Sequence, residues 1–258
     1  MKSEPKVSII TVAFNSGLTI RETIESVLNQ TYKNIEYIII DGGSQDNTLE
    51  IIKIFKEKIS YVISETDEGI YDGMNKGIKI ATGEIIGILN SDDKYFHNNI
   101  ITEIVNNFIE NDTDTLYGDL IYVDTKNPEK VIRYWKSGIY NRKKVSQGWM
   151  IPHPTFFVKK KIYNKYGMYS NKLRSAADYE MMIRLLYKNN CSVSYIPNIF
   201  VKMRSGGYSN QSIWNRLKAN NEDVIAWKIN GLVPPKFLRF LKPFLKINQF
   251  IKKPKNDE

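Results

Sequence analysis

Acidic side chains stand at the ends of several apolar, β-branched stretches of this sequence. Asp41 follows Ile35–Ile40, and Asp92 and Asp93 follow a second such stretch. Adjacent carboxylates repel each other, and a divalent cation is the commonest reason for keeping two of them at one strand end. Because no His or Cys cage accompanies them, the pair favours Mg²⁺ or Mn²⁺ shared with phosphate oxygens. The alternative is that such residues only start turns and cap helices, as we expect of Asp46.

A further carboxylate, Asp178, lies in the first turn of a predicted helix that begins near Ser175. A carboxylate in such a position can act as a general base that removes the proton of an attacking hydroxyl. The alternative role is to complement the helix dipole, which contributes about 0.3–1 kcal/mol, and taken alone this role is favoured. Glu180 is the weaker candidate for a base, and Arg184, one turn later, is its expected partner.

Strands and helices alternate over the first 95 residues. The strand-like stretches are apolar and β-branched, and the segments between them carry apolar residues at helical spacing. This rhythm predicts right-handed βαβ units, and therefore a Rossmann-like, mostly parallel central sheet flanked by helices. Ligands of such open sheets bind beyond the carboxyl ends of the strands, where the acidic residues stand. The predicted strands are Val7–Phe14, Ile35–Ile40, Tyr61–Ser64 and Glu84–Leu89, and the predicted helices include Ile20–Leu28, Leu49–Phe55 and Tyr71–Ala81.

The first helix is expected to begin with a capping box formed by Thr19 and Glu22. After residue 115 the pattern changes to short strands at 116–117, 120–123 and 131–135, followed by helices near 159–165 and 178–189. We expect this part to complete the same sheet, because no clear linker precedes it. The predicted organisation is one α/β domain over residues 1–233, with halves 1–95 and 96–233, and an appendage over residues 234–258.

The composition excludes several classes of protein. The chain has 258 residues, 42% hydrophobic and 12% aromatic, so it is long and apolar enough to bury a core. The single cysteine, Cys191, excludes an intramolecular disulfide framework and a cysteine-based metal cluster, and it favours a reducing compartment. No apolar run approaches the roughly 20 residues that span a bilayer, and no signal-peptide stretch precedes Val7. We therefore expect a cytoplasmic protein.

The formal net charge of +9 comes mainly from the C-terminal residues, since residues 236–255 hold seven basic side chains and no acid. Nucleic-acid binding would want basic groups along a groove of the main domain, so we expect no nucleic-acid partner. As a helix, residues 237–253 would place Phe, Leu and Ile on one half and basic residues on the other, with a kink at Pro243. This amphipathic pattern is typical of a helix on an anionic membrane, and the alternative is a helix docked on the domain.

Four strings in a fixed order carry a resemblance to a known family. They are VSIITVAFNS at 7–16, IIIDGGSQDNT at 38–48, DEGIYDGMNKGI at 67–78 and ATGEIIGILNSDD at 81–93. Together they resemble the family 2 glycosyltransferases with a GT-A fold, densely to about residue 95 and more thinly to about residue 210. Within that family the chain looks most like bacterial enzymes that build surface polysaccharides (O-antigen among them) from nucleotide sugars on lipid-linked acceptors. The resemblance implies inverting sugar transfer with one metal ion, a nucleotide-binding half at 1–95 and an acceptor-binding half at 96–233.

The resemblance also implies roles for residues near the nucleoside. Phe14 stands where the family often has a tyrosine, so that stacking is kept and a hydroxyl contact is lost. Asp41 aligns with the acid that accepts a hydrogen bond from the base imide N–H, which uracil and thymine both offer. The other residues that the resemblance brings to the base and ribose are Thr11, Ala13, Asp67 and Asn75.

The Ser91–Asp93 stretch occupies the place of the family's Asp-x-Asp motif, although its first position is not Asp. The resemblance therefore implies that Asp93 binds the metal, Mn²⁺ or Mg²⁺, and that Asp92 and Ser91 contact the nucleotide. Asp178 matches the family position where an acid begins a helix, and this match reverses the balance in favour of a catalytic base.

Two further residues are candidates for contacts with the diphosphate or the acceptor. His153 lies between two prolines, which are expected to keep its backbone extended; substrate contact and a structural hydrogen bond weigh about equally for it. Arg204 precedes the loop Ser205–Ser209, which is expected to close over the donor, and its guanidinium suits bidentate contact with phosphate. The alternative is a solvated loop arginine.

Three hypotheses follow from these residues and the resemblance. The first is a metal-dependent transferase that moves a sugar from a UDP-sugar to a hydroxyl of a polyprenyl-diphosphate-linked saccharide acceptor at the inner face of the cell membrane. The second keeps the fold but takes a dTDP-deoxysugar, as a rhamnosyl-type transferase would, because Asp41 does not distinguish uracil from thymine. The third is a catalytically silent nucleotide-sugar-binding protein, and the presence of Asp41, Asp93 and Asp178 argues against it.

Overall fold

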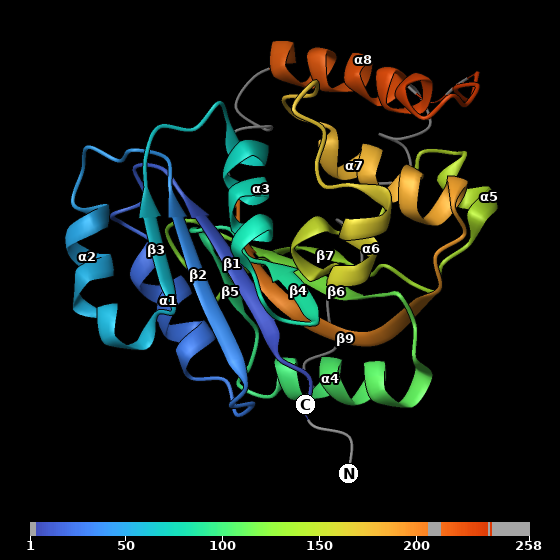
Figure 1. Ribbon diagram of the computed structural model, residues 1–258. Coiled ribbons are helices and arrows are strands. Elements are labelled where there is room, and N and C mark those ends of the chain that lie inside the picture. Colours follow the sequence, from blue (N-terminus) through green and yellow to red (C-terminus); the bar gives the residue numbers. More distant parts are fainter. Residues whose placement is uncertain (1–3, 206–212, 237, 239–258) are drawn as a thin grey trace.

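The computed structural model describes residues 4–205, 213–236 and 238. In this part of the chain, strands of both halves form one nine-stranded sheet flanked by helices (Figure 1). The strands are β1 Val7–Ala13, β2 Ile35–Asp41, β3 Tyr61–Ser64, β4 Ile85–Ile88, β5 Asp93–Tyr95, β6 Thr115–Val123, β7 Val131–Trp135, β8 Phe157–Lys159 and β9 Val193–Arg204. The α-helices are α1 Ile20–Leu28, α2 Thr48–Ile54, α3 Ile70–Ile80, α4 Ile100–Asn111, α5 Arg142–Val145, α6 Lys160–Tyr166, α7 Ala177–Met182 and α8 Ile213–Ile229. Short helical segments are η1 Lys56–Lys58, η2 His153–Thr155 and the π-helical η3 Ile183–Lys188.

The strand order is β3-β2-β1-β4-β8-β6-β9-β5, with β7 paired to β6. The first four strands are parallel, as the βαβ rhythm predicts. The second half joins by antiparallel pairing of β8 with β4, and β6 is parallel to β9 but antiparallel to β7 and β8. In the register, Ala13 lies opposite Asp41 and Asp41 opposite Ser64, so three strand ends lie side by side at the carboxyl edge.

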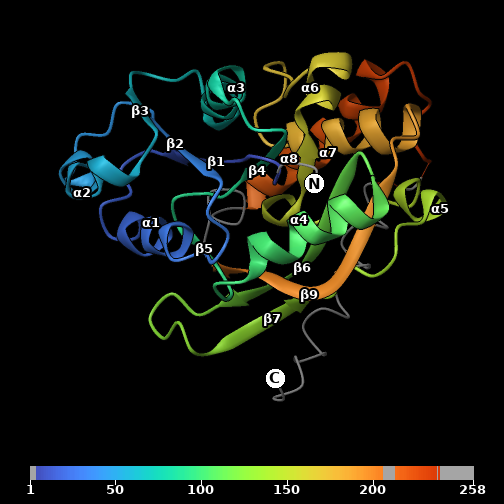
Figure 2. The same cartoon turned by 60° about the horizontal axis from the view of Figure 1, so that its bottom comes forward.

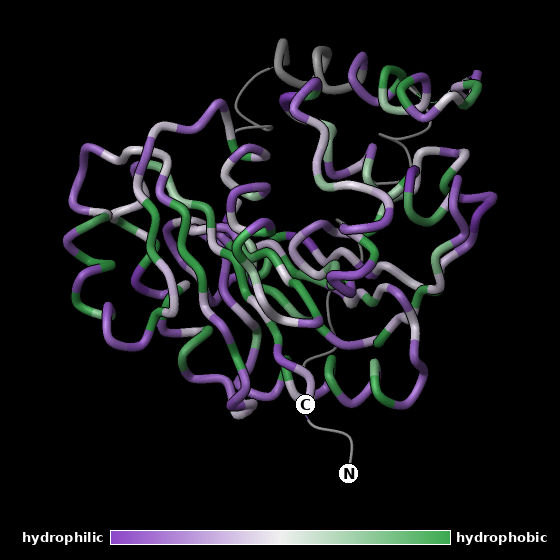
Figure 3. Tube along the Cα trace, in the orientation of Figure 1, coloured by the Kyte–Doolittle hydropathy of each residue, from purple (hydrophilic) through white to green (hydrophobic). Residues whose placement is uncertain are grey.

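Alternate residues of the parallel strands face two separate hydrophobic layers. Ile10, Ile38 and Ile86 pack with apolar residues of α3, α6, α7, η3 and α8. Ile9 and Ile39, on the opposite face, pack with α1, α2 and α4. Figure 2 shows α3, α6 and α7 along one side of the sheet, and Figure 3 shows hydrophobic residues concentrated on the central strands. A strand buried on both faces requires a continuous apolar run, which is why these stretches do not alternate.

Two long elements of the second half were not predicted. Residues 96–115 carried no predicted element, although Ile100, Ile104 and Phe108 of α4 have the spacing of a helix face and are buried. The strand β9 contains Pro197, which normally argues against a strand inside a sheet. Here the register between β6 and β9 shifts on either side of Asp119, so the proline lies at an irregularity of the pairing.

The predicted helix caps are corrected by the structure. The Thr19 side chain makes no capping hydrogen bond, and Glu22 instead pairs with Lys94 on β5. The second helix begins at Thr48 with Asn47 as its N-cap residue, although the carboxylate of Asp46 does accept the Thr48 N–H at 3.0 Å. The backbone expected to be extended at His153 forms the short 3₁₀ helix η2.

The expected amphipathic helix at 237–253 and the expected closing loop at 205–209 lie almost wholly outside the described residues. Among the described helices, none has both the length and the apolar composition to cross a membrane.

Candidate active site

At the end of β1, Phe14 is the side chain that a nucleoside could contact. Phe14 is 63% exposed directly after β1 and is available for stacking. Thr11 and Ala13 are buried, and the Thr11 hydroxyl lies 3.1 Å from that of Tyr37 in the layer beneath the sheet. The prediction that Thr11 and Ala13 stand beside the nucleoside is therefore restricted to their backbone atoms.

Asp41 is completely buried, and its carboxylate accepts hydrogen bonds from the loop that follows it and from Ser64 at the end of β3. The N–H groups of Gly43 and Ser44 donate to Oδ2 at 3.2 and 3.0 Å, and the Ser64 hydroxyl donates to the same oxygen at 2.7 Å. The Ser44 hydroxyl donates to Oδ1 at 2.5 Å. Each carboxylate oxygen offers about two lone-pair sites, so Oδ2 is fully engaged and a base imide N–H would bind Oδ1 beside the Ser44 hydroxyl.

Asp67 lies between the Asp41 loop and the start of α3, with only 8% of its side chain exposed. Its Oδ1 pairs with Lys76 at 2.5 Å, and burial raises the pKa of the Asp67 carboxyl. A Cβ atom on Gly73 would lie 2.7 Å from Oδ2 of Asp67 and 2.7 Å from Val12. Gly73 is thus required for the Asp67 carboxylate to fit against the sheet.

Asp93, the predicted metal ligand, opens β5 and is 1% exposed. Its Oδ2 accepts from the Asn90 amide at 3.0 Å, whereas Asp93 Oδ1 and Asn90 Oδ1 are buried without a hydrogen-bond partner among the described residues. Burial raises the pKa of Asp93 well above its usual range, and the charge of Asp92 raises it further. Burial also raises the pKa of Asp92, against the opposing effect of Arg204. Ser91 lies beside this pair, with its hydroxyl 2.7 Å from that of Ser16.

A small cavity adjoins these carboxylates. The volume open to the centre of a water molecule is about 10 Å³, close to that of one water. Three acids and three cations line it, namely Glu22, Asp92, Asp93, Lys94, Lys202 and Arg204. Glu22 forms ion pairs with both Arg204 and Lys94, the latter at 2.8 Å. Arg204 is therefore an ordered wall of this cavity, held by Glu22, rather than a solvated loop arginine.

The residues around this cavity fit a divalent cation that is shared with a phosphorylated ligand. Among the described residues, no group of three or more His, Cys, Asp or Glu side chains could hold a metal alone. Mg²⁺ commonly uses one or two carboxylates plus substrate phosphates, so the small number of ligands is not an obstacle. The two unpartnered oxygens, Asp93 Oδ1 and Asn90 Oδ1, are hard acceptors of the kind that such a cation prefers.

Asp178, the candidate base, lies in the first turn of α7 and is half-buried. Its Oδ1 accepts the Tyr71 hydroxyl at 3.2 Å and the Tyr179 N–H at 2.8 Å. Tyr71 comes from the first turn of α3, so the contact joins the two halves of the chain across 107 residues. Burial and the charge of Asp178 raise the pKa of Tyr71 well above its usual range, so Tyr71 remains a neutral donor.

His153 and Tyr169 complete the group around Asp178. The His153 Nε2 atom lies 2.6 Å from the Tyr169 hydroxyl, and the Tyr169 ring stacks on Tyr71 with centroids 5.6 Å apart. Burial lowers the pKa of His153, although the charge of Asp178 opposes this, so the imidazole is neutral near pH 7. The structural hydrogen bond considered for His153 is therefore observed. The charge of Asp178 acts on its imidazole, and a contact between His153 and a substrate stays a prediction.

Asn75, predicted at the base and ribose, has its amide engaged elsewhere. Its Oδ1 accepts the Tyr169 N–H and its Nδ2 donates to the Tyr169 carbonyl, both at 2.9 Å. The same Nδ2 donates to Asn171 at 2.9 Å. These contacts make Asn75 a clamp between α3 and the loop that precedes α7, and a contact with the nucleotide remains a prediction.

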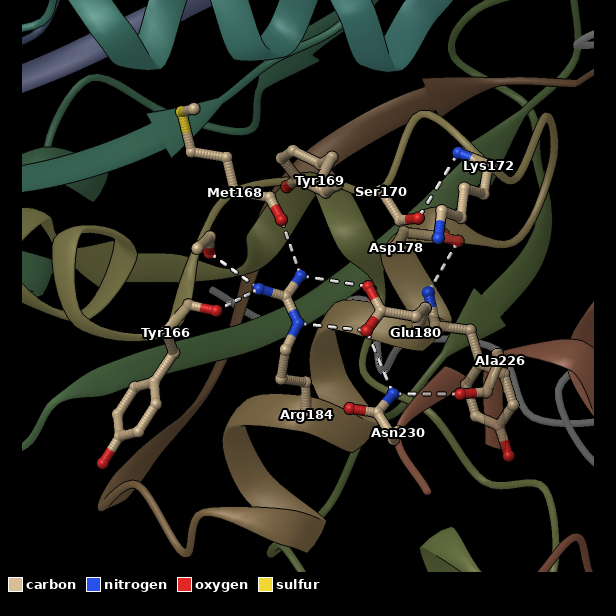
Figure 4. A network of polar contacts seen from close by, with 12 residues as sticks. Tyr166, Met168, Tyr169, Ser170, Lys172, Asp178, Glu180, Arg184, Ala226 and Asn230 are labelled. Carbon is tan, nitrogen blue, oxygen red and sulfur yellow. Dashed lines mark hydrogen bonds and ion pairs between the residues drawn. The ribbon is translucent and has the colours of Figure 1, made fainter. Parts of the chain in front are cut away.

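Glu180 differs sharply from Asp178, two residues earlier on α7. It is 2% exposed, and both of its oxygens receive the guanidinium of Arg184 at 3.0 Å (Figure 4). Arg184 also donates to the carbonyls of Tyr166, Gly167 and Met168, and Asn230 donates to Glu180 at 3.0 Å. The expected pairing of Glu180 with Arg184 is confirmed, and its geometry explains why Glu180 has no free oxygen for chemistry.

Burial raises the pKa of Tyr122 on β6, Arg133 opposes this, and the charges of both Asp93 and Asp178 raise it further. No sequence pattern predicted a role in the site for Tyr71, Tyr122 or Tyr169. Tyr71 lies inside one of the recognised strings, but nothing in the sequence distinguishes these tyrosines from the other buried aromatic residues.

Known proteins of similar sequence identify the family of this chain. The sequence profile of the family described as "Glycosyl transferase family 2" matches residues 8–167. The PGL/p-HBAD biosynthesis glycosyltransferase of Mycobacterium tuberculosis (strain ATCC 25177 / H37Ra) is 27% identical over 212 residues, which cover 80% of each chain. The chain belongs to glycosyl transferase family 2.

Solved structures support the fold independently. Staphylococcus aureus TarS 1-349 superposes with a TM-score of 0.64 at 18% identity over 86% of this chain, which spans 65% of the length of TarS 1-349. TarS 1-349 has also been crystallised with UDP-GlcNAc. The mannosyltransferase PcManGT of Pyrobaculum calidifontis, in complex with GDP-Man and Mn²⁺, gives a TM-score of 0.66 at 14% identity and covers 96% of this chain and 72% of its own. The protein is a glycosyltransferase with the GT-A fold.

Proposed function

We propose that this protein catalyses inverting transfer of a sugar from a UDP-sugar to a hydroxyl of a saccharide acceptor. The observation that carries the proposal is the Asp178 carboxylate at the start of α7, whose Oδ1 is held by the Tyr71 hydroxyl and the Tyr179 N–H. No hydrogen bond to Asp178 Oδ2 is found within the described ranges, so this oxygen is available to a substrate. Family membership and the donor complexes of TarS and PcManGT support a nucleotide-sugar substrate.

The proposed reaction uses the chain's own groups in a balanced step. Asp178 Oδ2 accepts the proton of the acceptor hydroxyl as that oxygen forms a bond to the anomeric carbon. The bond between the anomeric carbon and the phosphate oxygen breaks, and the nucleoside diphosphate leaves with the electron pair. Attack opposite the leaving group inverts the configuration at the anomeric carbon.

The leaving diphosphate would lie against the residues that line the cavity at Asp93, which itself has room for about one water. Asp93, with Asp92 beside it, would hold Mn²⁺ or Mg²⁺ together with the phosphates, and Arg204 would exchange Glu22 for phosphate oxygens. A bound divalent cation would neutralise the charge that grows on the diphosphate. The cationic Lys94 and Lys202 on the same walls support a site for a polyanion.

Phe14 and Asp41 are the proposed contacts of the nucleobase, with Asp67 and the loop at Gly42 close by. Asp41 would accept the imide N–H at Oδ1, which receives only the Ser44 hydroxyl among the described residues. TarS was crystallised with UDP and PcManGT with GDP-Man, so the fold alone does not select the base. We choose uracil because Asp41 offers an acceptor to an imide; a dTDP-deoxysugar is the alternative of the same chemistry.

We further propose that the acceptor is linked to a polyprenyl diphosphate and that residues 236–258 attach the protein to the inner face of an anionic membrane. The support is the amphipathic, basic sequence of that segment. Seven cations near a surface, at about 1 kcal/mol each, suffice for reversible attachment together with an apolar face. Co-sedimentation with anionic vesicles tests this: full-length protein should bind and lose binding as salt rises, and equal binding of a 1–235 variant would refute it.

The function itself is tested by a donor screen. Thermal unfolding with Mn²⁺ and a panel of UDP-, dTDP- and GDP-sugars should show stabilisation by UDP-sugars, because a ligand that binds only the folded state raises the melting temperature. The stabilising donors are then tested for hydrolysis and transfer. Stabilisation by dTDP-deoxysugars alone would favour the rival donor, and binding without any turnover would favour a catalytically silent protein.

A further inference from the structure

The carboxylate of Asp178 is held on one side only. Both protein donors, the Tyr71 hydroxyl and the Tyr179 N–H, bond to Oδ1, at 3.2 and 2.8 Å. The Tyr179 N–H belongs to the same helix turn and fixes the distance of Oδ1 from the backbone. The Tyr71 hydroxyl approaches from α3, and a second donor from another direction fixes the rotation of the carboxylate plane. Oδ2 is thereby directed away from both donors.

The Tyr71 hydroxyl is itself fixed by an arrangement that α3 shares with the loop before α7. Tyr71 and Asn75 are four residues apart on α3 and therefore lie on one face of the helix. Asn75 clamps the backbone N–H and C=O of Tyr169, and the Tyr169 ring stacks on the Tyr71 ring with planes 21° apart. The Tyr169 hydroxyl is in turn paired with His153 at 2.6 Å.

The same loop is secured from its other end by Arg184. The guanidinium donates to three successive carbonyls at Tyr166, Gly167 and Met168, immediately before Tyr169, and Glu180 holds it in place (Figure 4). Glu180 and Asp178 lie on the same turn of α7. The start of this helix therefore carries the Asp178 carboxylate and, through Glu180, Arg184 and Tyr169, also positions Tyr71.

We propose that Tyr71 is a positioning residue for the catalytic base: its hydroxyl aligns the Asp178 carboxylate so that Oδ2 faces the acceptor hydroxyl. This inference rests on the proposed function, in which Asp178 is the base. The aligning donor is a neutral hydroxyl, which orients the carboxylate without pairing with it as a cation would. The other groups that sense the charge of Asp178 are Tyr122, His153 and Tyr169, and Glu222 also acts on Tyr71.

Tyr71→Phe tests the proposal by removing only the hydroxyl, with Tyr134→Phe as a matched control. Tyr134 donates to the buried carboxylate of Asp119 at 2.7 Å, so the control loses a hydrogen bond of the same kind outside the site. We expect Tyr71→Phe to lower kcat about tenfold, as loss of a hydrogen bond to a charged group implies, while the donor KM stays within about twofold. The acidic limb of its pH–rate profile should move to higher pH, because the charged carboxylate loses a donor that favours it.

The control should keep the wild-type kcat and the wild-type acidic limb. An unchanged limb in Tyr71→Phe, or a parallel loss of donor binding and turnover, would overturn the proposal, since a merely structural role moves no limb. Asp178→Asn is measured alongside to separate the two levels of inference. If Asp178→Asn keeps full turnover, the proposed base is wrong; if it is inactive and Tyr71→Phe behaves as wild type, only the role of Tyr71 is wrong.

Discussion

The two acidic centres at the carboxyl edge of the sheet have opposite surroundings. Around Asp93, three cations and two further carboxylates line a small cavity, and one oxygen of Asp93 is buried without a partner among the described residues. The donors to Asp178 are neutral, namely the Tyr71 hydroxyl and the Tyr179 N–H, and Tyr71 stacks on Tyr169, whose hydroxyl pairs with His153. A carboxylate among cations and unpartnered oxygens suits the binding of a metal and phosphates, whereas a nearby cation would make a carboxylate a weaker base. Neutral donors align the Asp178 carboxylate without pairing with it as a cation would.

The largest expected effect is that of Asp178→Asn. We expect kcat to fall about 10³-fold while UDP affinity in the presence of Mn²⁺ changes little, because a general base acts in the transition state. Single-turnover kinetics and calorimetric titration of UDP measure the two quantities separately. Parallel losses in both would mean that Asp178 only maintains the structure, and the contrast between the two centres would fail.

Asp93→Asn should mainly affect the metal-dependent binding of UDP. We expect the dependence of UDP binding on Mn²⁺ to disappear and activity to fall about 100-fold, since the cation stabilises charge on the leaving diphosphate. Asp92→Asn provides the internal comparison and should have the smaller effect, because Asp92 is less buried and neighbours Arg204. Full activity of the wild type in excess chelator would refute a metal at this centre.

Glu180→Gln should reduce stability. The substitution leaves the Arg184 guanidinium without its carboxylate inside the protein, and we expect a loss of about 2–3 kcal/mol in the free energy of unfolding. For a chain of this length that loss corresponds to a fall of roughly 5–10 °C in melting temperature, measurable by calorimetry. Asp178→Asn is the control, and it should unfold within about 2 °C of the wild type. If Asp178→Asn lowered the melting temperature more than Glu180→Gln, the assignment of Glu180 as the structural acid would be wrong.

Arg204→Gln should have the smallest effect and should concern only the phosphates. We expect about tenfold weaker binding of UDP, as the loss of one charge-assisted contact implies, and no change for uridine. Titrating both ligands into the same variant supplies the control within one experiment. Equal weakening of uridine would show that Arg204 supports the fold of the site through Glu22 instead of contacting the diphosphate.

The parallel half of the fold was predictable because its signals are local. Stretches such as Val7–Phe14 and Ile35–Ile40 are apolar throughout because both faces of the strand are covered, and the turn residues that follow them mark the strand ends. The second half was less predictable for a physical reason. The strand β9 contains Pro197, and only the irregular pairing with β6 around Asp119 accommodates it.

Local patterns were misleading where a side chain had a distant partner. Thr19 and Glu22 have the spacing of a capping box, yet Glu22 is drawn away by Arg204, 182 residues later in the chain. The spacing of Thr19 and Glu22 carries no information about these two cations, which only the folded chain brings to Glu22. Asn75 was placed near the nucleotide by the family resemblance; its amide contacts the Tyr169 backbone, 94 residues away, and a nucleotide contact stays a prediction.

By itself, the sequence determined which acids stand at the edge of the sheet, because strand ends and helix starts follow from short-range patterns of apolar and turn residues. Only the tertiary structure decided what each acid is able to do. Glu180 has both oxygens engaged by Arg184, Asp93 retains a buried oxygen without a partner in the described part of the chain, and Asp178 is aligned by Tyr71 from 107 residues away. The reason is that the reactivity of a carboxylate depends on the donors, charges and burial around it, and these come from segments that only the folded chain brings together.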